Sequence, residues 1–230
     1  MTKAKAKNTK QDNLTEIESA LTSTEQFIER NQKILSIIAG VILLIAAGYV
    51  SFKHFYVVPK EKNAQEQMFM AEFYFERDSF NLAINGDGNY LGFLDIIDDY
   101  GMTQAAKLAK YYTGISYLHL GEFEEAISYL NSFKTNDMLI APILEGAKGD
   151  AYSELGQTDK AISAYKKAAG LKNDFTSPIY LMKLGKLLEK TQKYDEALKT
   201  YKEIKDNHPK SMEATTVDRY IGRVEVLKSR

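Results

Sequence analysis

An uninterrupted apolar run near the N-terminus stands out from the pattern of hydrophobic and polar positions. Residues 34–52 read ILSIIAGVILLIAAGYVSF and carry no charge between Lys33 and Lys53. At about 1.5 Å rise per residue, a helix of this length spans roughly 28 Å, which is close to the hydrocarbon thickness of a bilayer. Aromatic side chains such as Tyr49 and Phe52 at one end favour a membrane interface. The pattern predicts a single transmembrane helix over residues 34–52.

The segment before this run is polar and basic. Residues 1–22 form a lysine-rich tail, and we expect disorder over residues 1–13. Ser23 and Gln26 have the spacing of a capping box, which predicts one helix over residues 23–58 that contains the apolar run. So long a polar segment before the run argues against a cleaved signal peptide and favours a retained anchor. The basic residues on either side do not decide the orientation of this anchor.

The rest of the chain shows helical periodicity and repeats itself. Glycine and alanine recur at intervals of 35 and 36 residues, at Gly114, Gly149 and Gly185 and at Ala126, Ala161 and Ala197. The residue four positions after each alanine is large: Leu130, Tyr165 and Tyr201. Small residues let the two helices of a hairpin approach closely, and neighbouring hairpins must stack to bury their apolar faces. We predict repeats at 107–140, 142–175 and 178–211, a divergent first hairpin at 60–100 and a capping helix at 212–229, together a solenoid over residues 59–230.

Composition narrows the classes of function. The chain has 30 Lys and Arg against 31 Asp and Glu, so no basic excess is available for binding nucleic acid. The absence of cysteine excludes disulfides, thiol nucleophiles, Cys-ligated zinc and a lipid anchor attached through cysteine. His54, His119 and His208 are scattered and lack the spacing of metal ligands. We therefore predict a non-enzymatic protein with no catalytic residue, cofactor or metal.

The repeated segments resemble the tetratricopeptide repeat, a helix–turn–helix unit of about 34 residues. The resemblance is carried by YYTGISYLHLGEFEEAISYL (111–130), KGDAYSELGQTDKAISAY (148–165) and LGKLLEKTQKYDEALKTY (184–201). It implies an all-α fold, a single N-terminal transmembrane helix followed by a helix–turn–helix solenoid whose concave groove binds proteins. The groove residues it implies are Leu108, Tyr111, Ile115, Leu118 and His119 in the first repeat, Gly146, Asp150 and Glu154 in the second, and Met182, Lys186 and Lys190 in the third. The Lys and Asn with which chaperone adaptors of this family hold a C-terminal carboxylate are absent, because those positions are Tyr111 and Ile115.

The order of tail, anchor and repeats resembles the bacterial ancillary subunit of the Sec translocon. Residues 71–97, AEFYFERDSFNLAINGDGNYLGFLDII, look like those of Bacteroidetes members of that family. The resemblance implies a single-pass inner-membrane protein with a cytoplasmic N-terminus and periplasmic repeats. Its partners would be the Sec translocon, a membrane-anchored peptidyl-prolyl isomerase chaperone and emerging secretory chains. Gly40 and Gly48 would let its membrane helix approach translocon helices.

Two alternatives to a translocon subunit stay open. One is an envelope scaffold for cell division or outer-membrane assembly. The other is a cytosol-facing receptor that has the same anchor and the opposite topology.

Overall fold

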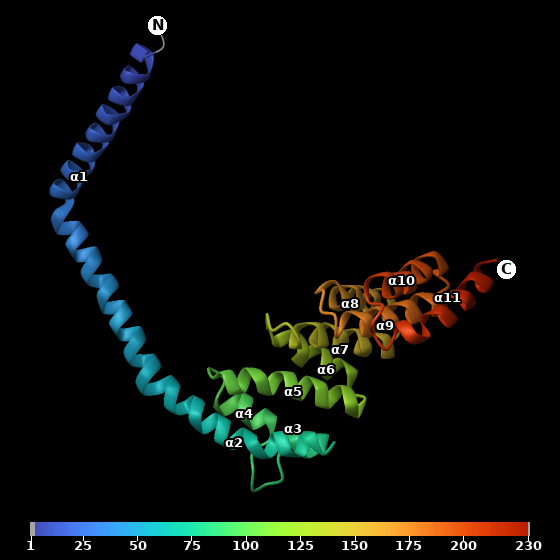
Figure 1. The fold of residues 1–230 in the computed structure, drawn as a ribbon. Coiled ribbons are helices and arrows are strands. Elements are labelled where there is room, and N and C mark those ends of the chain that lie inside the picture. Colours follow the sequence, from blue (N-terminus) through green and yellow to red (C-terminus); the bar gives the residue numbers. More distant parts are fainter. Residues whose placement is uncertain (1–2, 230) are drawn as a thin grey trace. The chain divides into compact units, whose positions relative to one another are not determined.

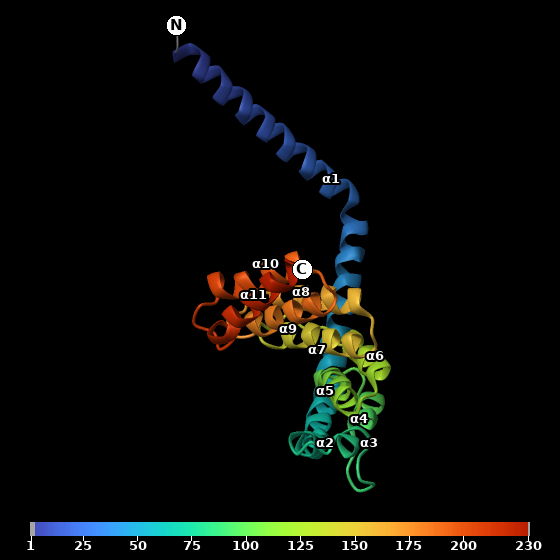
Figure 2. The ribbon, with the colours of Figure 1, turned by 90° about the vertical axis from the view of Figure 1, so that its right-hand side faces the viewer.

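The computed structural model describes residues 3–229, with side chains from Phe27 onward, in two units, Met1–Pro59 and Lys60–Arg230. All the regular elements of the described residues are helices (Figures 1 and 2). A long apolar helix comes first in the chain, and stacked helix pairs make up the second unit. This confirms the prediction of an all-α fold with that order of parts.

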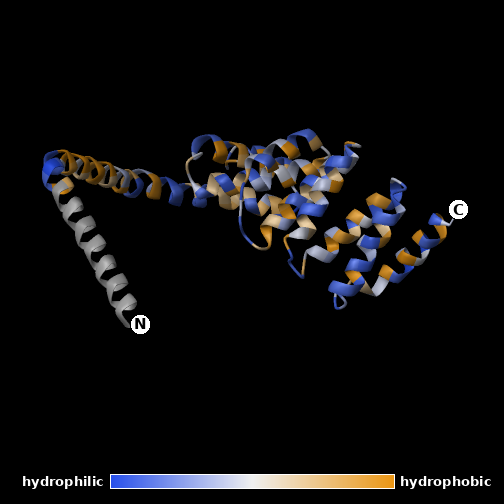
Figure 3. Cartoon of the chain, turned by 90° about the horizontal axis from the view of Figure 1, so that it is seen from above, coloured by the Kyte–Doolittle hydropathy of each residue, from blue (hydrophilic) through white to orange (hydrophobic). Residues whose placement is uncertain are grey.

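The first unit is a long helix, α1 (Lys3–Phe52), followed by one π-helical turn, η1 (Lys53–Val57). Its apolar stretch is the orange part of the N-terminal helix in Figure 3. Among the described residues, this is the one helix that is long and apolar enough to cross a membrane, and none of its apolar window is buried. A Cβ atom added at Gly40 or Gly48 would meet no other atom within 4 Å, so the surface at both glycines is open.

The first helix begins earlier than the sequence pattern indicates. It starts at Lys3 instead of Ser23, so the prediction of a disordered stretch up to Asn13 is wrong from Lys3 onward. No glycine or proline precedes Gly40, and the segment is rich in Ala, Lys, Gln, Glu and Leu, which favour helix. Met1 and Thr2 lie outside the described residues, as do the side chains of Ser23 and Gln26 that would form the capping box.

The predicted helix over residues 23–58 also ends differently. The α-helical part of α1 stops at Phe52, and α2 (Val58–Glu76) begins just after the π-helical turn, one residue before Pro59. Proline has no backbone N–H to donate within a helix. A π-helical turn is a common way for a helix to accommodate such a break in its hydrogen bonding.

The second unit contains three consecutive helix pairs. The pairs are α5 (Gln104–Leu120) with α6 (Phe123–Ser132), α7 (Ile140–Glu154) with α8 (Thr158–Gly170), and α9 (Ser177–Lys190) with α10 (Tyr194–Asn207). The last helix, α11 (Ala214–Lys228), packs on α10 and α9 and closes the stack. In Figure 1 the pairs follow one another from green to red, so that chain order is also packing order.

The recurring small and large residues lie against each other within each pair. A Cβ atom at Gly149 would lie only 2.5 Å from Cε1 of Tyr165, so α7 and α8 can approach this closely only at glycine. Gly114 and Leu130 make the equivalent contact between α5 and α6. The interval of 35 to 36 residues in the sequence is therefore the interval between equivalent packing contacts.

The divergent first hairpin contains an additional helix. Between α2 and α4 (Phe93–Asp99) lies the short helix α3 (Phe80–Asn85), which is not part of the predicted two-helix hairpin. Ala83 of α3 is fully buried in a cluster with Met68, Phe93 and Ile96. One buried turn of helix is too short to produce a periodic signal in the sequence.

The carboxylate of Glu61 joins the start of α2 to the start of α5. Its two oxygens accept hydrogen bonds from the backbone N–H groups of Gln104, at 2.6 Å, and Ala105, at 3.1 Å. The hydroxyl of Thr103 accepts from the N–H of Ala106 at 3.0 Å. These groups satisfy three of the four N–H groups that a helix start leaves without intrahelical partners. A negative charge at this end also complements the helix dipole.

Substituting Glu61 with glutamine is expected to destabilise the second unit by about 1–2 kcal/mol. Glutamine retains the size of the side chain but loses the charge and one of the two acceptor oxygens. The control is Glu66→Gln in the same helix, since Glu66 makes only an exposed 3.8 Å pair with Lys62 and should change stability by less than about 0.5 kcal/mol. Urea unfolding followed by circular dichroism measures both variants, and equal effects of the two would contradict this role of Glu61.

Candidate protein-binding surfaces

The groove positions of the first repeat are largely occupied by neighbouring helices. Tyr111, Ile115 and Leu118 are half-buried against a cluster that includes residues of α6 and α7. Leu108 packs in the same way on the cluster of the first hairpin. The ring of His119 stacks on Phe80 of α3, with centroids 4.5 Å apart and planes 5° from parallel. Little of this predicted apolar surface is open.

Two groove positions of the later repeats are also filled. Gly146, in α7, is buried beneath the ring of Tyr180 from α9, which occupies the space that a side chain would need. Met182 has only 8% of its surface exposed and belongs to the core of the third repeat. The groove positions of these two repeats that remain exposed are Glu154, Lys186 and Lys190, and His119 of the first repeat is exposed as well.

Asp150, the remaining groove position of the second repeat, is held by its neighbours. Both of its oxygens lie 2.7 Å from Nζ of Lys183, and Oδ1 also accepts a 2.7 Å hydrogen bond from the hydroxyl of Tyr165. Burial and then the charge of Asp150 raise the pKa of Tyr165 above its usual range and that of Tyr180 to about 12. Asp150 therefore joins α7, α8 and α9.

Cations of α9 and α11 gather around the ring of Tyr220. Lys186, Arg219 and Arg223 lie 5.4, 5.4 and 4.8 Å from its centroid. Desolvation raises the pKa of Tyr220, but the charge of Lys186 and the hydrogen bond from Arg219 outweigh this effect, so the pKa lies below its usual value. Arg223 also forms a bidentate pair with Glu189, at 2.6 and 2.7 Å. This end of the solenoid has a positive local field.

A row of exposed apolar side chains lies at the connections between successive helix pairs. These residues, here called the apolar edge, are Met102, Met138, Phe175 and Met212, and they are 60, 79, 81 and 84% exposed. Each stands two residues before the first residue of α5, α7, α9 or α11. They are separated in the sequence by 36, 37 and 37 residues. The four residues of the apolar edge thus occupy the same structural position in successive repeats.

Each residue of the apolar edge lies next to a side chain that accepts a hydrogen bond from the backbone of the turn or of the helix start that follows. Near Met138, Oδ1 of Asp137 accepts from the N–H groups of Leu139 and Ile140, at 2.8 and 2.9 Å, and these bonds lower its pKa. The side chains that accept backbone hydrogen bonds at the other three connections are Thr103, Asn173 and Ser211. The side-chain oxygens are therefore directed at the backbone, and the apolar side chains remain exposed to solvent.

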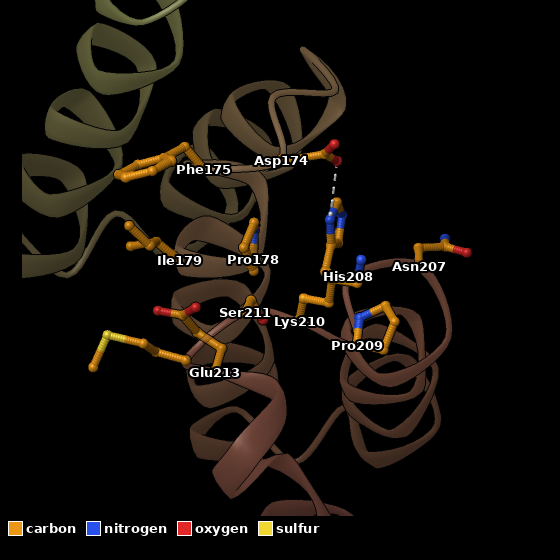
Figure 4. A pocket seen from close by; sticks show the side chains of 11 residues that line it. Asp174, Phe175, Pro178, Ile179, Asn207, His208, Pro209, Lys210, Ser211 and Glu213 are labelled. Atoms are coloured by element: carbon orange, nitrogen blue, oxygen red, sulfur yellow. Dashed lines mark ion pairs between the residues drawn. The ribbon is translucent and has the colours of Figure 1, made fainter.

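The last two residues of the apolar edge flank a pocket with a volume of about 550 Å³. Figure 4 shows Phe175, Pro178 and Ile179 on one side of it and His208 and Pro209 on the other. Nδ1 of His208 lies 3.5 Å from a carboxylate oxygen of Asp174 at the rim. Apolar walls with a few polar groups at the rim are typical of a site that receives an apolar side chain.

Family models match the helix pairs directly. Models of the tetratricopeptide repeat match residues 108–137 and residues 147–211. The chain carries tetratricopeptide repeats. A search of curated proteins found no significant match.

The tetratricopeptide repeats indicate a protein-binding scaffold, and such domains are typically non-catalytic. Among the residues that the structure describes, no group of three or more His, Asp or Glu side chains is arranged to hold a metal ion. Two carboxylates at the groove, Asp150 and Glu189, are engaged in ion pairs with Lys183 and Arg223.

The apolar edge cannot be recognised from hydrophobic periodicity within helices. Its four residues lie in the connections, where an isolated Met or Phe gives no helical pattern. The signal that reveals it is the constant offset of two residues before each repeat's first helix. Aligning the tetratricopeptide repeats on their helix starts makes this offset visible in the sequence alone.

Proposed function

We propose that this protein is a non-enzymatic, membrane-anchored scaffold whose tetratricopeptide repeats bind protein partners at the Sec translocon. The partners proposed are the translocon itself, a membrane-anchored peptidyl-prolyl isomerase chaperone and emerging secretory chains. The apolar edge is the observation that supports protein binding most directly. Soluble surfaces rarely expose large apolar side chains in an ordered series without a partner to cover them.

The chemistry of the apolar edge suits apolar segments of differing sequence. Three of its four residues are methionine, whose flexible, polarisable side chain adapts to varied partners. Next to Phe175 and Met212, the pocket offers space for one larger apolar side chain. An unfolded secretory chain exposes such side chains before it folds.

The apolar helix supports membrane anchoring. The exposed stretch within α1 has the length and composition of a bilayer span. Gly40 and Gly48 present open surface at which another helix can approach closely. The location proposed is the bacterial inner membrane, with the N-terminus in the cytoplasm and the repeats in the periplasm, as the resemblance to the ancillary translocon subunit implies.

Crosslinking in intact spheroplasts tests partner and orientation together. A membrane-impermeant amine-reactive crosslinker reaches the lysines of the repeats only if the repeats face outward. The expected result is capture of Sec channel subunits or a periplasmic foldase with the full-length chain, followed by copurification in mild detergent. Capture only after lysis, or stoichiometric capture of a cell-division or outer-membrane assembly protein in place of these partners, would overturn the proposal.

The double variant Phe175→Ser/Met212→Ser is expected to capture roughly tenfold less of the partner, as for loss of central interface residues. Both side chains are more than four-fifths exposed, so folding should be unaffected. The matched control is Phe69→Ser/Val226→Ser, which removes exposed apolar side chains away from the apolar edge. Equal capture by the two double variants would show that the apolar edge does not bind the partner.

A further inference from the structure

A second surface, different in character from the apolar edge, lies between α7, α9 and α11. Two hollows flank α9, and Lys186 and Lys190 line both of them. One hollow, of about 250 Å³, is completed by residues of α7 and α8 such as Ser153 and Tyr165. The other, of about 360 Å³, is completed by Arg223 and Leu227 of α11. We call this surface, with the neighbouring Arg219, the basic cleft.

The carboxylates that line the basic cleft are already neutralised. Asp150 binds Lys183 through both oxygens, and Glu189 binds Arg223 through both oxygens. Three cations are left over, Lys186, Lys190 and Arg219, and none of them forms an ion pair with any residue from Phe27 to Ser229. The excess of positive charge is local, because residues 53–230 carry 24 basic and 26 acidic side chains.

We propose that the basic cleft binds an acidic segment of a protein partner, with carboxylates of that segment paired to Lys186 and Lys190. The two lysines are four residues apart on α9 and so project from one face of the helix. Unpaired cations at the surface of an otherwise acidic domain attract a negatively charged partner and orient it. This inference rests on the proposed role as a protein-binding scaffold and assigns the ligand class of a surface other than the apolar edge.

The shape of the basic cleft favours a polypeptide over a small anion. The two hollows lie on opposite sides of Lys186 and Lys190. Their walls include the aliphatic side chains of Leu187 and Leu227. An extended peptide can place alternate side chains on either side of its backbone, so that apolar residues enter the hollows and carboxylates meet the lysines. The acidic balance of the domain opposes long polyanions such as nucleic acid.

Fluorescence anisotropy with a labelled peptide of alternating glutamate and leucine tests the proposal. The protein is the full-length chain in nonionic detergent, and the neutral control peptide has glutamine at each glutamate position. The acidic peptide is expected to bind, and added salt should weaken its binding because exposed charge pairs are screened. The neutral peptide should bind at least several-fold more weakly. Equal binding of the two peptides would overturn the proposal.

The variant Lys186→Gln/Lys190→Gln is expected to weaken binding of the acidic peptide roughly 5- to 20-fold. The matched control, Lys199→Gln/Lys202→Gln, removes the same charge from exposed lysines of α10 that line a different hollow. Circular dichroism melting curves of both variants should match that of the unmodified chain. Equal weakening by both variants, or displacement of the peptide by inorganic pyrophosphate at the same concentration as by unlabelled peptide, would overturn the proposal.

This test is separate from the crosslinking experiment. The lysine variant leaves the apolar edge intact, so loss of peptide binding with unchanged partner capture places the acidic segment on a different protein. Absence of peptide binding in the unmodified chain, with normal partner capture, would refute the acidic ligand and leave the scaffold role standing.

Discussion

Substitution of Gly185 with alanine is expected to destabilise the repeats by about 1–3 kcal/mol, although alanine is the better helix former. An added Cβ atom would overlap Cε1 of Tyr201 and lie 2.8 Å from two further atoms of the ring. Tyr201 is fully buried, and its hydroxyl donates to Glu189, which also holds Arg223. The ring cannot retreat without breaking these contacts, so α9 and α10 must separate.

Gly222→Ala provides the matched control for this prediction. Gly222 lies in α11 and is exposed, and a Cβ atom added there would meet no other atom within 4 Å, so alanine should stabilise by roughly 0.5–1 kcal/mol. Thermal unfolding followed by circular dichroism distinguishes the two, since each kcal/mol corresponds to about 2–4 °C for a domain of this size. Shifts of the same sign for both variants would show that packing against Tyr201 does not limit the size of the residue at position 185.

Raising the pH from about 10 to 11 is expected to lower the free energy of unfolding by roughly 3 kcal/mol, from three tyrosines alone. Burial, followed by the charge of Asp150 or Glu189, raises the pKa of Tyr165, Tyr180 and Tyr201 above the ordinary value of 10.0. The folded chain then keeps protons that the unfolded chain releases. The stabilisation is complete well below pH 10 and declines as pH rises through 10, by roughly 1 kcal/mol for each tyrosine between about pH 10 and 11.

Tyr180→Phe isolates one part of this alkaline effect. Its hydroxyl makes no hydrogen bond to the described residues, so phenylalanine removes the titrating group and little else at neutral pH. The loss between about pH 10 and 11 should shrink by roughly one third, because one of three groups no longer titrates. Urea unfolding at a series of pH values measures this. An unchanged slope in the variant would show that lysine titration, common to both chains, causes the loss.

The helix pairs could be predicted from sequence because their contacts are repeated. Gly149 against Tyr165, and Gly185 against Tyr201, are the same small-to-large contact in successive pairs, and this contact recurs in the sequence at a constant interval. The apolar run is equally visible, since nineteen consecutive uncharged residues need no structural context. Both are local or periodic features, which a single sequence records.

Contacts made once, between segments far apart in the sequence, could not be predicted. Glu61 meets the start of α5 across more than forty residues, and nothing near Glu61 in the sequence marks it as a cap. Burial of Gly146 by Tyr180 likewise depends on how two repeats stack, so a position assigned to the groove became part of the core. The resemblance to the tetratricopeptide repeat implies that Lys186 and Lys190 belong to the groove, and both side chains are exposed.

The recurrence of one exposed position per repeat gives the apolar edge a property that a single pocket lacks. A long polypeptide lying along four equivalent positions can shift by one repeat and meet the same kind of side chain again. This choice of registers adds a statistical gain of up to about 0.8 kcal/mol, RT ln 4, without any new contact. It also favours rapid dissociation and rebinding of individual contacts over one long-lived bound state, because each contact is weak by itself and can be released alone. If the apolar edge binds emerging chains as proposed, a chain can stay bound while it moves along the repeats.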